Sequence, residues 1–274
     1  MKKLDDDSAE VATRTRFVLS PRRGCELLRF EQRREGLTVL PDDGKSFGAI
    51  TVDLSSASIL RRAKQGRGGL LAKAVLPAAG QPMPLVWDVT GGLGRDAMTL
   101  ALLGCEVVAF ERNPFVGMLL LDARSRALKG DRQIAEAASR LTIRIGDART
   151  AMRADESNST APGSGRPDVI YIDPMFPEGN GKSSGKKQGN GKAAVKKAAV
   201  KKAAVKKDAM LLRMLVGEGA DPLQDEELFT LSMQVAKSRV VVKRSLRAPA
   251  IVESPPPQAS FKGKSVRVDR YYCL

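Results

Sequence analysis

The stretch that decides the fold is Leu85-Val-Trp-Asp-Val-Thr-Gly-Gly-Leu-Gly-Arg-Asp96. It begins as an apolar strand, passes through three closely spaced glycines and ends on polar residues that suit the start of a helix. Glycines in a turn between a strand and a helix let the backbone approach a ligand, at the strand ends where parallel sheets bind nucleotides. We therefore expect a cofactor pocket at this turn.

The rhythm of strand, turn and helix continues after this stretch and predicts an α/β fold, a Rossmann-like parallel sheet covered on both faces. Strands are predicted at 85–89, 106–110, 141–145, 168–172 and 239–243. Helices are predicted at 95–103, 114–128, about 208–216 and 225–237. Asn113 before Pro114 is typical of a helix start. The alternation from Ser265 to Tyr272 predicts a last, antiparallel edge strand.

The first part of the chain has a different pattern. Short β-rich runs at 17–19, 25–30, 37–40 and 49–52 predict a small antiparallel meander. Two short helices, 55–64 and 69–76, should follow it, joined by a glycine-rich turn. We therefore divide the chain into an N-terminal β-rich subdomain with two short helices, residues 1–84, and a main domain, residues 85–274.

Composition removes several function classes. The 274 residues include no histidine, which excludes Ser-His and Cys-His nucleophiles and the usual zinc hydrolase sites. The three cysteines, Cys25, Cys105 and Cys273, have no paired spacing, so neither a metal site nor a disulfide framework is expected. No apolar run reaches the length of a membrane span, and the charged start, residues 1–7, lacks the apolar segment of a secretory signal. We expect a cytoplasmic protein that acts as a monomer.

The net charge of +15 is unevenly distributed, and ten of the positive charges belong to lysines between residues 179 and 207. This low-complexity segment contains three copies of Ala-Ala-Val-Lys-Lys, whose period aligns no apolar stripe on a helix. We expect a disordered Lys-rich insertion, either a passive solvated loop or a polycation for nucleic-acid phosphates. A second basic cluster, which includes Arg61, Arg62 and Arg67, is a candidate RNA contact.

The glycine turn alone does not separate two cofactors. Gly92, Gly94 and Ala97 satisfy the dinucleotide fingerprint, and Glu111 lies 19 residues after Gly92, where an acid would bind ribose hydroxyls. Asp88 and Asp96 favour S-adenosylmethionine, because acids suit its cationic methionine part and would repel a diphosphate. Asp147, after the third strand, adds a polar group that could contact an adenine amine.

The tip of the fourth strand carries Asp173-Pro-Met-Phe-Pro177. The lone pair of an exocyclic base amine is delocalised into the ring, so an enzyme that methylates it must localise and aim that pair. The carboxylate of Asp173 and backbone carbonyls could accept its hydrogen bonds, and Phe176 could stack on the base. From these five residues alone, an ordinary proline-rich turn is an equal alternative.

Together these motifs resemble the 16S ribosomal RNA guanine-N2 methyltransferase family, small subunit methyltransferase J. The resemblance covers about residues 48–250 and rests on the order of Gly92-Leu-Gly-Arg-Asp-Ala97, Glu111-Arg-Asn-Pro114 and Asp173-Pro-Met-Phe-Pro177. It implies a class I S-adenosylmethionine-dependent methyltransferase whose substrate is a guanine near the 3′ end of small subunit ribosomal RNA, within the 30S particle.

The resemblance also assigns residues. It implies cofactor contacts at Arg95, Asp96, Glu111, Arg112 and Asp173, and at the pair Asp147 and Ala148, where relatives carry small hydroxyl residues. We also assign Asp88, Gly92 and Gly94 to cofactor binding. Catalysis is assigned to Asp173, Pro174 and Phe176. Lys243 and Arg244 are further candidate RNA contacts.

Three other functions stay open from the residues. An adenine-N6 nucleic-acid methyltransferase needs the same amine-holding tip. A nicotinamide dehydrogenase would use the same glycine turn, but gives no reason for Asp173-Pro-Met-Phe176. A non-catalytic RNA-binding ribosome assembly factor could retain the fold.

Overall fold

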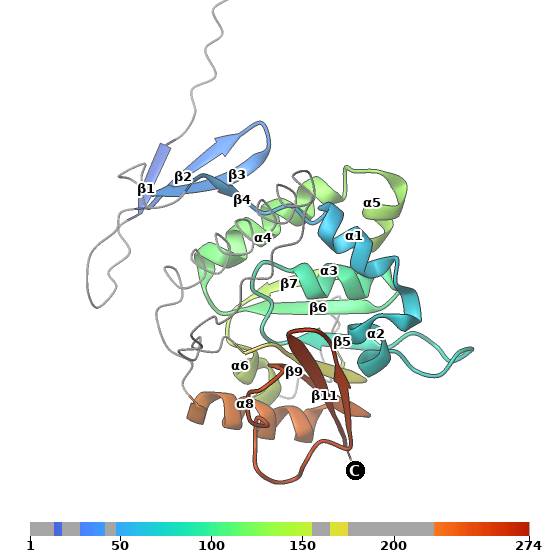
Figure 1. Ribbon diagram of the computed structural model, residues 1–274. Coiled ribbons are helices and arrows are strands. Elements are labelled where there is room, and N and C mark those ends of the chain that lie inside the picture. Colours follow the sequence, from blue (N-terminus) through green and yellow to red (C-terminus); the bar gives the residue numbers. More distant parts are fainter. Residues whose placement is uncertain (1–13, 18–27, 42–47, 155–164, 175–221, 274) are drawn as a thin grey trace, which may run out of the picture.

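The computed structural model describes residues 14–17, 28–41, 48–154, 165–174 and 222–273. Its centre is a seven-stranded sheet in the order β10-β11-β9-β8-β5-β6-β7 (Figure 1). The strands are β5 Leu85–Asp88, β6 Glu106–Glu111, β7 Leu141–Ile145, β8 Val169–Ile172, β9 Arg239–Ser245, β10 Ala259–Lys262 and β11 Val266–Tyr272. Strands β5 to β9 run parallel, whereas β11 is antiparallel to β9 and to β10.

Helices cover both faces of this sheet. The helices are α3 Arg95–Leu102, α4 Pro114–Ala127, α5 Arg132–Ser139, α6 Ala148–Arg153 and α8 Pro222–Val235. Side chains of β8 alternate between the two faces: Val169 and Tyr171 join the core under α3 to α5, and Ile170 and Ile172 the core under α6 and α8. A buried run without charged residues is typical of a strand that is packed on both faces.

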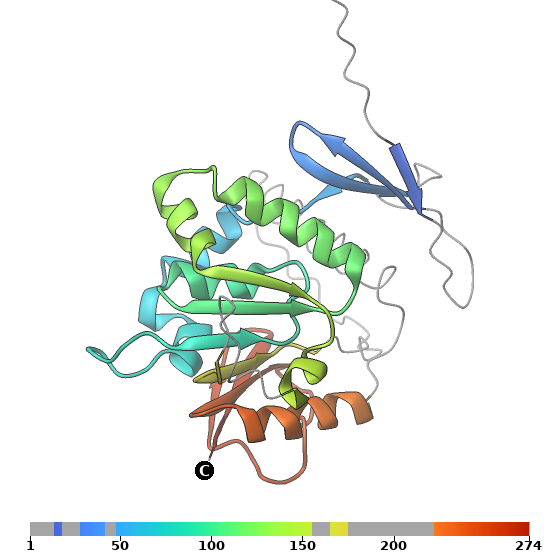
Figure 2. The same cartoon turned by 180° about the vertical axis from the view of Figure 1, so that it is seen from behind.

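The small sheet at the N-terminal end lies beside α4 in both views of the molecule (Figures 1 and 2). Its four antiparallel strands are β1 Arg14–Phe17, β2 Leu28–Arg33, β3 Gly36–Pro41 and β4 Ile50–Thr51. The ring of Phe30 stacks on Phe115 of α4 with 5.7 Å between centroids. The carboxylate of Asp122, also on α4, accepts the backbone N–H of Leu37 at 3.0 Å. Apolar and polar contacts together therefore fasten the small sheet to α4.

The next segment returns to the main sheet. Helix α1 (Ala57–Ala63) packs against α3, and α2 (Leu70–Val75) packs against β11, with the 3-10 turn Gly66–Gly68 between them. Ile59 and Ala74 are 1% and 0% exposed. The two short helices that we grouped with the N-terminal subdomain therefore complete the core of the main sheet.

Most of the predicted elements are confirmed within one to three residues. The antiparallel strand predicted at 265–272 is confirmed as β11, but its predicted place at the edge is wrong, because β10 pairs with the outer side of β11 and becomes the edge. Helices α5 and α6 and strand β10 were not predicted. The helix expected at about 208–216 lies outside the described residues. None of the helices within the described ranges combines the length and apolar character needed to cross a membrane.

Candidate functional site

The glycine turn after β5 is pressed against the next strand. The backbone N–H of Gly91 donates to the carbonyl of Phe110 at 2.8 Å, and a Cβ on Gly91 would lie 2.9 Å from that oxygen. Gly94, at the start of α3, has a φ of +70°, in the left-handed region that favours glycine. The turn therefore has no side chains at its glycines. It lies at the end of β5, which has β6 on one side and β8 on the other, so the strand order reverses there. Open parallel sheets bind ligands at such a point.

Glu111, at the end of β6, holds the turn from the other side. Its Oε2 accepts the N–H of Gly92 at 2.8 Å, and its Oε1 accepts the N–H of Asn113 at 2.7 Å. Asn113 in turn caps α4 by accepting the N–H of Phe115 at 3.0 Å. Burial of the Glu111 side chain raises its pKa, and the two backbone donors oppose that shift.

Asp88, the last residue of β5, is 2% exposed. Burial, reinforced by the charge of Asp96, raises its pKa to about 8. Its Oδ1 accepts the N–H of Thr90 at 3.2 Å, and the hydroxyl of Thr90 accepts the N–H of Asp173 at 2.7 Å. A buried acid that no cation of the described residues hydrogen-bonds favours a cationic ligand, which fits the methionine ammonium of S-adenosylmethionine.

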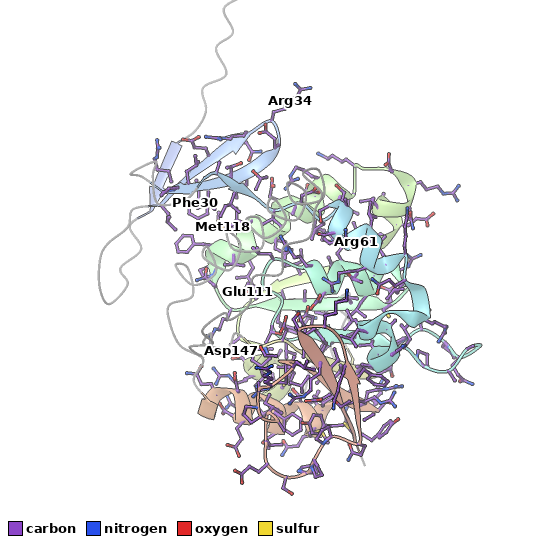
Figure 3. The ribbon with its side chains drawn as sticks, viewed as in Figure 1. Phe30, Arg34, Arg61, Glu111, Met118 and Asp147 are labelled. Carbon is purple, nitrogen blue, oxygen red and sulfur yellow. The ribbon has the colours of Figure 1, made fainter. Side chains whose placement is uncertain are left out.

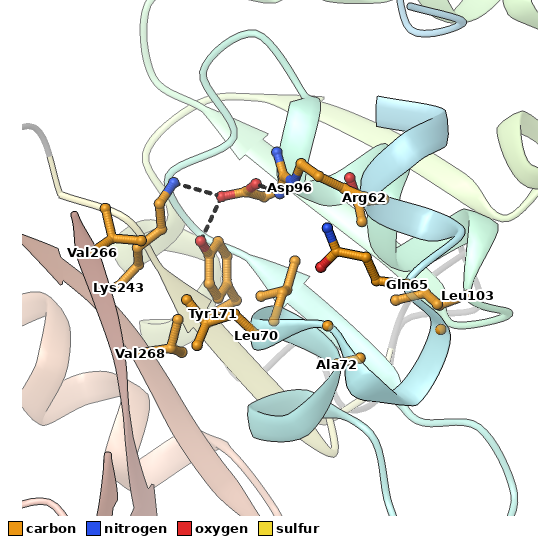
Figure 4. Close-up of a pocket in the computed structure, with 14 residues that line it drawn as sticks. Arg62, Gln65, Leu70, Ala72, Asp96, Leu103, Tyr171, Lys243, Val266 and Val268 are labelled. Carbon is orange, nitrogen blue, oxygen red and sulfur yellow. Dashed lines mark hydrogen bonds and ion pairs between the residues drawn. The ribbon is translucent and has the colours of Figure 1, made fainter. Parts of the chain in front are cut away.

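Beside the turn lies a partly buried polar cluster, which we call the Asp96 cluster: Arg62, Asp96, Tyr171, Asp173 and Lys243. Figure 4 shows Arg62, Asp96, Tyr171 and Lys243 of this cluster. Lys243 Nζ donates to Asp96 Oδ2 at 2.9 Å and to Asp173 Oδ2 at 2.5 Å. The hydroxyl of Tyr171 donates to Asp96 Oδ2 at 2.6 Å, and Arg62 pairs with Asp96 Oδ1. Four elements, α1, α3, β8 and β9, thus meet at one carboxylate.

The electrostatics of the Asp96 cluster follow from these contacts. Although burial opposes ionisation, Lys243 and Arg62 hold the pKa of Asp96 well below its usual range. The two facing carboxylates raise the pKa of Lys243 above its ordinary value despite its burial. The ammonium and the Asp96 carboxylate therefore both stay charged near neutral pH.

Asp147 is the acid at the end of the third parallel strand. Asp147 follows β7 and caps α6 by accepting the N–H of Arg149 at 2.9 Å, and the guanidinium of Arg149 also binds the carboxylate of Asp147. This contact lowers the pKa of Asp147. Figure 3 shows Glu111 and Asp147 at the same edge of the main sheet, where the parallel strands end.

A pocket of about 230 Å³ adjoins the Asp96 cluster on the face covered by α1 and α2. Its walls combine apolar and charged side chains, among them Arg62, Gln65, Leu71, Tyr171, Lys243 and Val268. The pocket therefore lies between the segment from α1 to α2 and strand β11, and Asp96 lies at its polar end.

Several predicted site residues are brought together. Asp88, Glu111, Asp147 and Asp173 do end or follow four successive parallel strands, and Asp96 lies beside them. Of the others assigned to the cofactor, Arg95 opens α3, Ala148 is buried at the start of α6, and Arg112 is exposed and donates to Gln224 Oε1 at 3.0 Å. Pro174 is buried, and Phe176 and the insertion 179–207 lie outside the described residues.

The candidate RNA contacts separate into two groups. Arg61 and Arg67 are exposed on the segment from α1 to the 3-10 turn. Arg62 pairs with Asp96, Lys243 is occupied by two carboxylates, and Arg244 is 6% exposed and donates to the carbonyl of Pro249 at 3.0 Å. Because these three cations are more than half buried and bind acceptors inside the protein, we propose no RNA contact for them.

Sequence reasoning missed Thr90 and Tyr171. Tyr171 precedes Asp173 by two residues on a strand, and the alternation of side chains puts both on one face, so the spacing contained this signal. Nothing in the sequence indicated that the Thr90 hydroxyl would join β5 to the tip of β8.

Comparison with known proteins agrees with this geometry. A family model described as "Putative SAM-dependent methyltransferase" matches residues 12–190 and 197–273. Ribosomal RNA small subunit methyltransferase J of Pseudomonas aeruginosa is 38% identical over 239 residues, 86% of this chain and 79% of that protein. The protein of the same name from Neisseria meningitidis is 37% identical over 223 residues, 81% of this chain and 76% of that protein.

A solved structure supports the fold as well. The crystal structure of a SAM-dependent methyltransferase from Neisseria gonorrhoeae aligns with a TM-score of 0.61 at 28% identity, covering 88% of this chain and 80% of that chain. The sheet order, the glycine turn and the acidic strand tips are thus accompanied by sequence identity over most of the chain. The chain belongs to the family of S-adenosylmethionine-dependent methyltransferases that includes ribosomal RNA small subunit methyltransferase J.

Proposed function

We propose that this protein transfers the methyl group of S-adenosylmethionine to the exocyclic N2 amine of a guanine in small subunit ribosomal RNA. The names of its relatives support the RNA, and the family resemblance supports the guanine amine. The observation that carries the proposal is the position of Asp173 directly beside the glycine turn. Its backbone N–H donates to the hydroxyl of Thr90, and its Oδ2 accepts a hydrogen bond from Lys243.

The residues of the chain divide the work. Asp88, the turn at Gly91 to Gly94, and Glu111 hold the cofactor, which supplies a methyl group whose bond to sulfur breaks as its bond to nitrogen forms. Lys243 binds Oδ2 of Asp173, which leaves Oδ1 to accept an N–H of the amine. Holding the donor carbon and the nitrogen in line contributes on the order of 7–11 kcal/mol in favourable intramolecular cases.

Proton removal needs no histidine. The amine becomes strongly acidic once it carries the fourth substituent, so its proton passes to Asp173 or to water after the carbon-nitrogen bond has formed. The absence of histidine from the chain is compatible with this order of events. Phe176 stacks on the face of the guanine and fixes its plane.

The RNA contacts are proposed on the exposed basic side chains of α1, the 3-10 turn and α2. Arg61, Lys64, Arg67 and Lys73 are all exposed, and this segment forms one wall of the pocket beside the Asp96 cluster. Phosphate contacts of this kind position a nucleic acid without reading its sequence. We further propose that the protein acts as a cytoplasmic monomer on the 30S particle.

The test is a transfer assay with tritiated S-adenosylmethionine on small subunits from cells that lack this protein, followed by mass analysis of the nucleosides. We expect label in N2-methylguanosine, and none with Asp173→Ala. Label in N6-methyladenosine would instead support the adenine enzyme. If no RNA were labelled although the cofactor bound, the assembly factor would be favoured. Free 16S RNA in a parallel reaction tests whether the particle is the substrate.

A further inference from the structure

Lys243 lies opposite Asp173 because of the strand register. In the parallel pair β8 and β9, Tyr171 pairs with Val241 and Ile172 with Val242, so Asp173 and Lys243 come next on their strands. Tyr171 and Val241 face the core under α3, and the alternation of side chains turns Asp173 and Lys243 to the same face. The contact between the two charges is therefore built into the sheet.

The acids around this contact outnumber the cations that contact them by one. Three carboxyl groups, of Asp88, Asp96 and Asp173, share the site with two cations that contact them, Arg62 and Lys243. The guanidinium of Arg62 contacts Asp96, so in the described part of the chain Lys243 is the cation in contact with Asp173. Without it, Asp173 would lie beside two other acids with no cation of the described residues in contact with it.

We propose that Lys243 is a positioning residue for methyl transfer. Its ammonium joins Asp96, on the cofactor side, to Asp173, on the amine side, and thereby fixes the orientation of the Asp173 carboxylate. With Oδ2 bound to Lys243, Oδ1 is the atom that meets the substrate amine. The inference rests on the proposed role of Asp173 and adds the residue on which that role depends.

The network has a second support that strengthens the assignment. Asp96 Oδ2 accepts hydrogen bonds from both Lys243 and Tyr171, so the phenol limits the positions that the carboxylate, and through it the ammonium, can take. Tyr171 is completely buried, and its pKa is raised well above the usual value, so it remains a donor. A chain of two carboxylates, one ammonium and one phenol therefore links α3 to the tip of β8.

The first test compares Lys243→Met and Lys243→Arg with the wild type. We expect kcat to fall about a hundredfold in Lys243→Met, with a much smaller change in the KM for RNA. Loss of the cation raises the pKa of Asp173, so the acidic limb of the pH-rate profile should move to higher pH. Lys243→Arg keeps the charge and should restore the wild-type limb and part of kcat. The matched control is Lys237→Met, whose ammonium contacts Asp168 at the opposite end of β8.

A second measurement needs no turnover. In the cofactor-free protein, Asp173 with a raised pKa costs stability as pH rises, so the melting temperature of Lys243→Met should fall further below wild type at pH 8 than at pH 5. A wild-type kcat and pH limb in folded Lys243→Met would overturn the proposal, as would a pH-independent melting difference. Failure of the wild type to methylate RNA would instead overturn the proposed function. The melting temperatures would then still test whether Lys243 stabilises the Asp173 carboxylate.

Discussion

The carboxylate of Glu111 accepts the N–H of Gly92 at 2.8 Å across 19 residues of chain, so the acid at the end of β6 fixes the glycine turn after β5. The same carboxylate binds the N–H of Asn113 through its other oxygen. One side chain therefore sets both the shape of the turn and the start of α4, and its substitution should disturb cofactor binding before it disturbs the sheet.

Glu111→Gln tests this relationship. An amide keeps the size but presents an NH₂ group to one of the two backbone donors, and loss of a hydrogen bond to a charged group costs about 1.5–3 kcal/mol. We expect affinity for S-adenosylhomocysteine to fall roughly 10- to 100-fold, measured by titration calorimetry. Glu106→Gln, at the exposed start of the same strand, is the matched control and should bind as wild type.

Asp173→Asn should reduce methyl transfer by about two to three orders of magnitude, because a neutral amide attracts the developing positive charge on the amine less strongly. Circular dichroism should show an unchanged fold. Asp168→Asn changes the equivalent side chain at the start of the same strand and should keep transfer. Transfer at the wild-type rate by Asp173→Asn would remove the carboxylate from the mechanism.

Asp88 predicts a specific dependence of stability on pH. Its pKa in the folded protein is about 8, above its usual value of 3.8, so the folded state keeps a proton that the unfolded state loses, and stability falls as pH rises from about 4 to 8. Asp88→Asn removes this loss. Its melting temperature, relative to wild type, should therefore rise across this window in the cofactor-free protein. A constant difference from pH 4 to pH 8 would contradict the assigned protonation state.

Gly92→Ala and Gly94→Ala separate backbone strain from crowding. Both glycines have positive φ, at +53° and +70°, and each alanine costs about 1–2 kcal/mol in that region. A Cβ at Gly94 would also lie 2.4 Å from Leu120 Cδ1, whereas the nearest atom to one at Gly92 is 3.7 Å away. We expect Gly94→Ala to lower the melting temperature clearly more than Gly92→Ala, in thermal denaturation followed by circular dichroism.

The Lys-rich insertion predicts a salt effect. Removal of residues 179–207 takes away ten positive charges, so RNA affinity should fall and its dependence on salt concentration should become less steep. The comparison is with a variant in which the ten lysines are changed to glutamine at constant length. Equal affinity of all three proteins at low salt would make the insertion a passive spacer.

The parallel sheet could be predicted because β5, β6, β7 and β8 are short, mostly apolar runs that end on, or are followed by, an acid or a glycine. The acidic tips were found for the same reason, since parallel strands bring their carboxyl ends to one edge. The contacts of Lys243 could not be anticipated, because a lysine at a strand end looks the same in sequence whether it meets solvent or two carboxylates. Only the register of β8 and β9 distinguishes the two.

Strand β10 and helix α6 were missed because both are short and their own sequences contain little signal. Strand β10 is four residues long and only partly buried, so it has no apolar run to reveal it. Helix α6 has six residues and depends on Asp147 as its cap. Both elements are stabilised by neighbours that are distant in sequence, which a local pattern does not contain.

The packing of α2 against β11 has a consequence for how the protein is made. The guanidinium of Arg270 reaches the carbonyl of Lys73 at 3.5 Å, although 197 residues separate them. During synthesis, α1 and α2 leave the ribosome long before the strand that closes their pocket, and contacts between such distant segments form late. A nascent chain that still lacks β11 therefore cannot complete the wall beside Asp96, so the pocket is finished only after nearly all of this sequence has been translated.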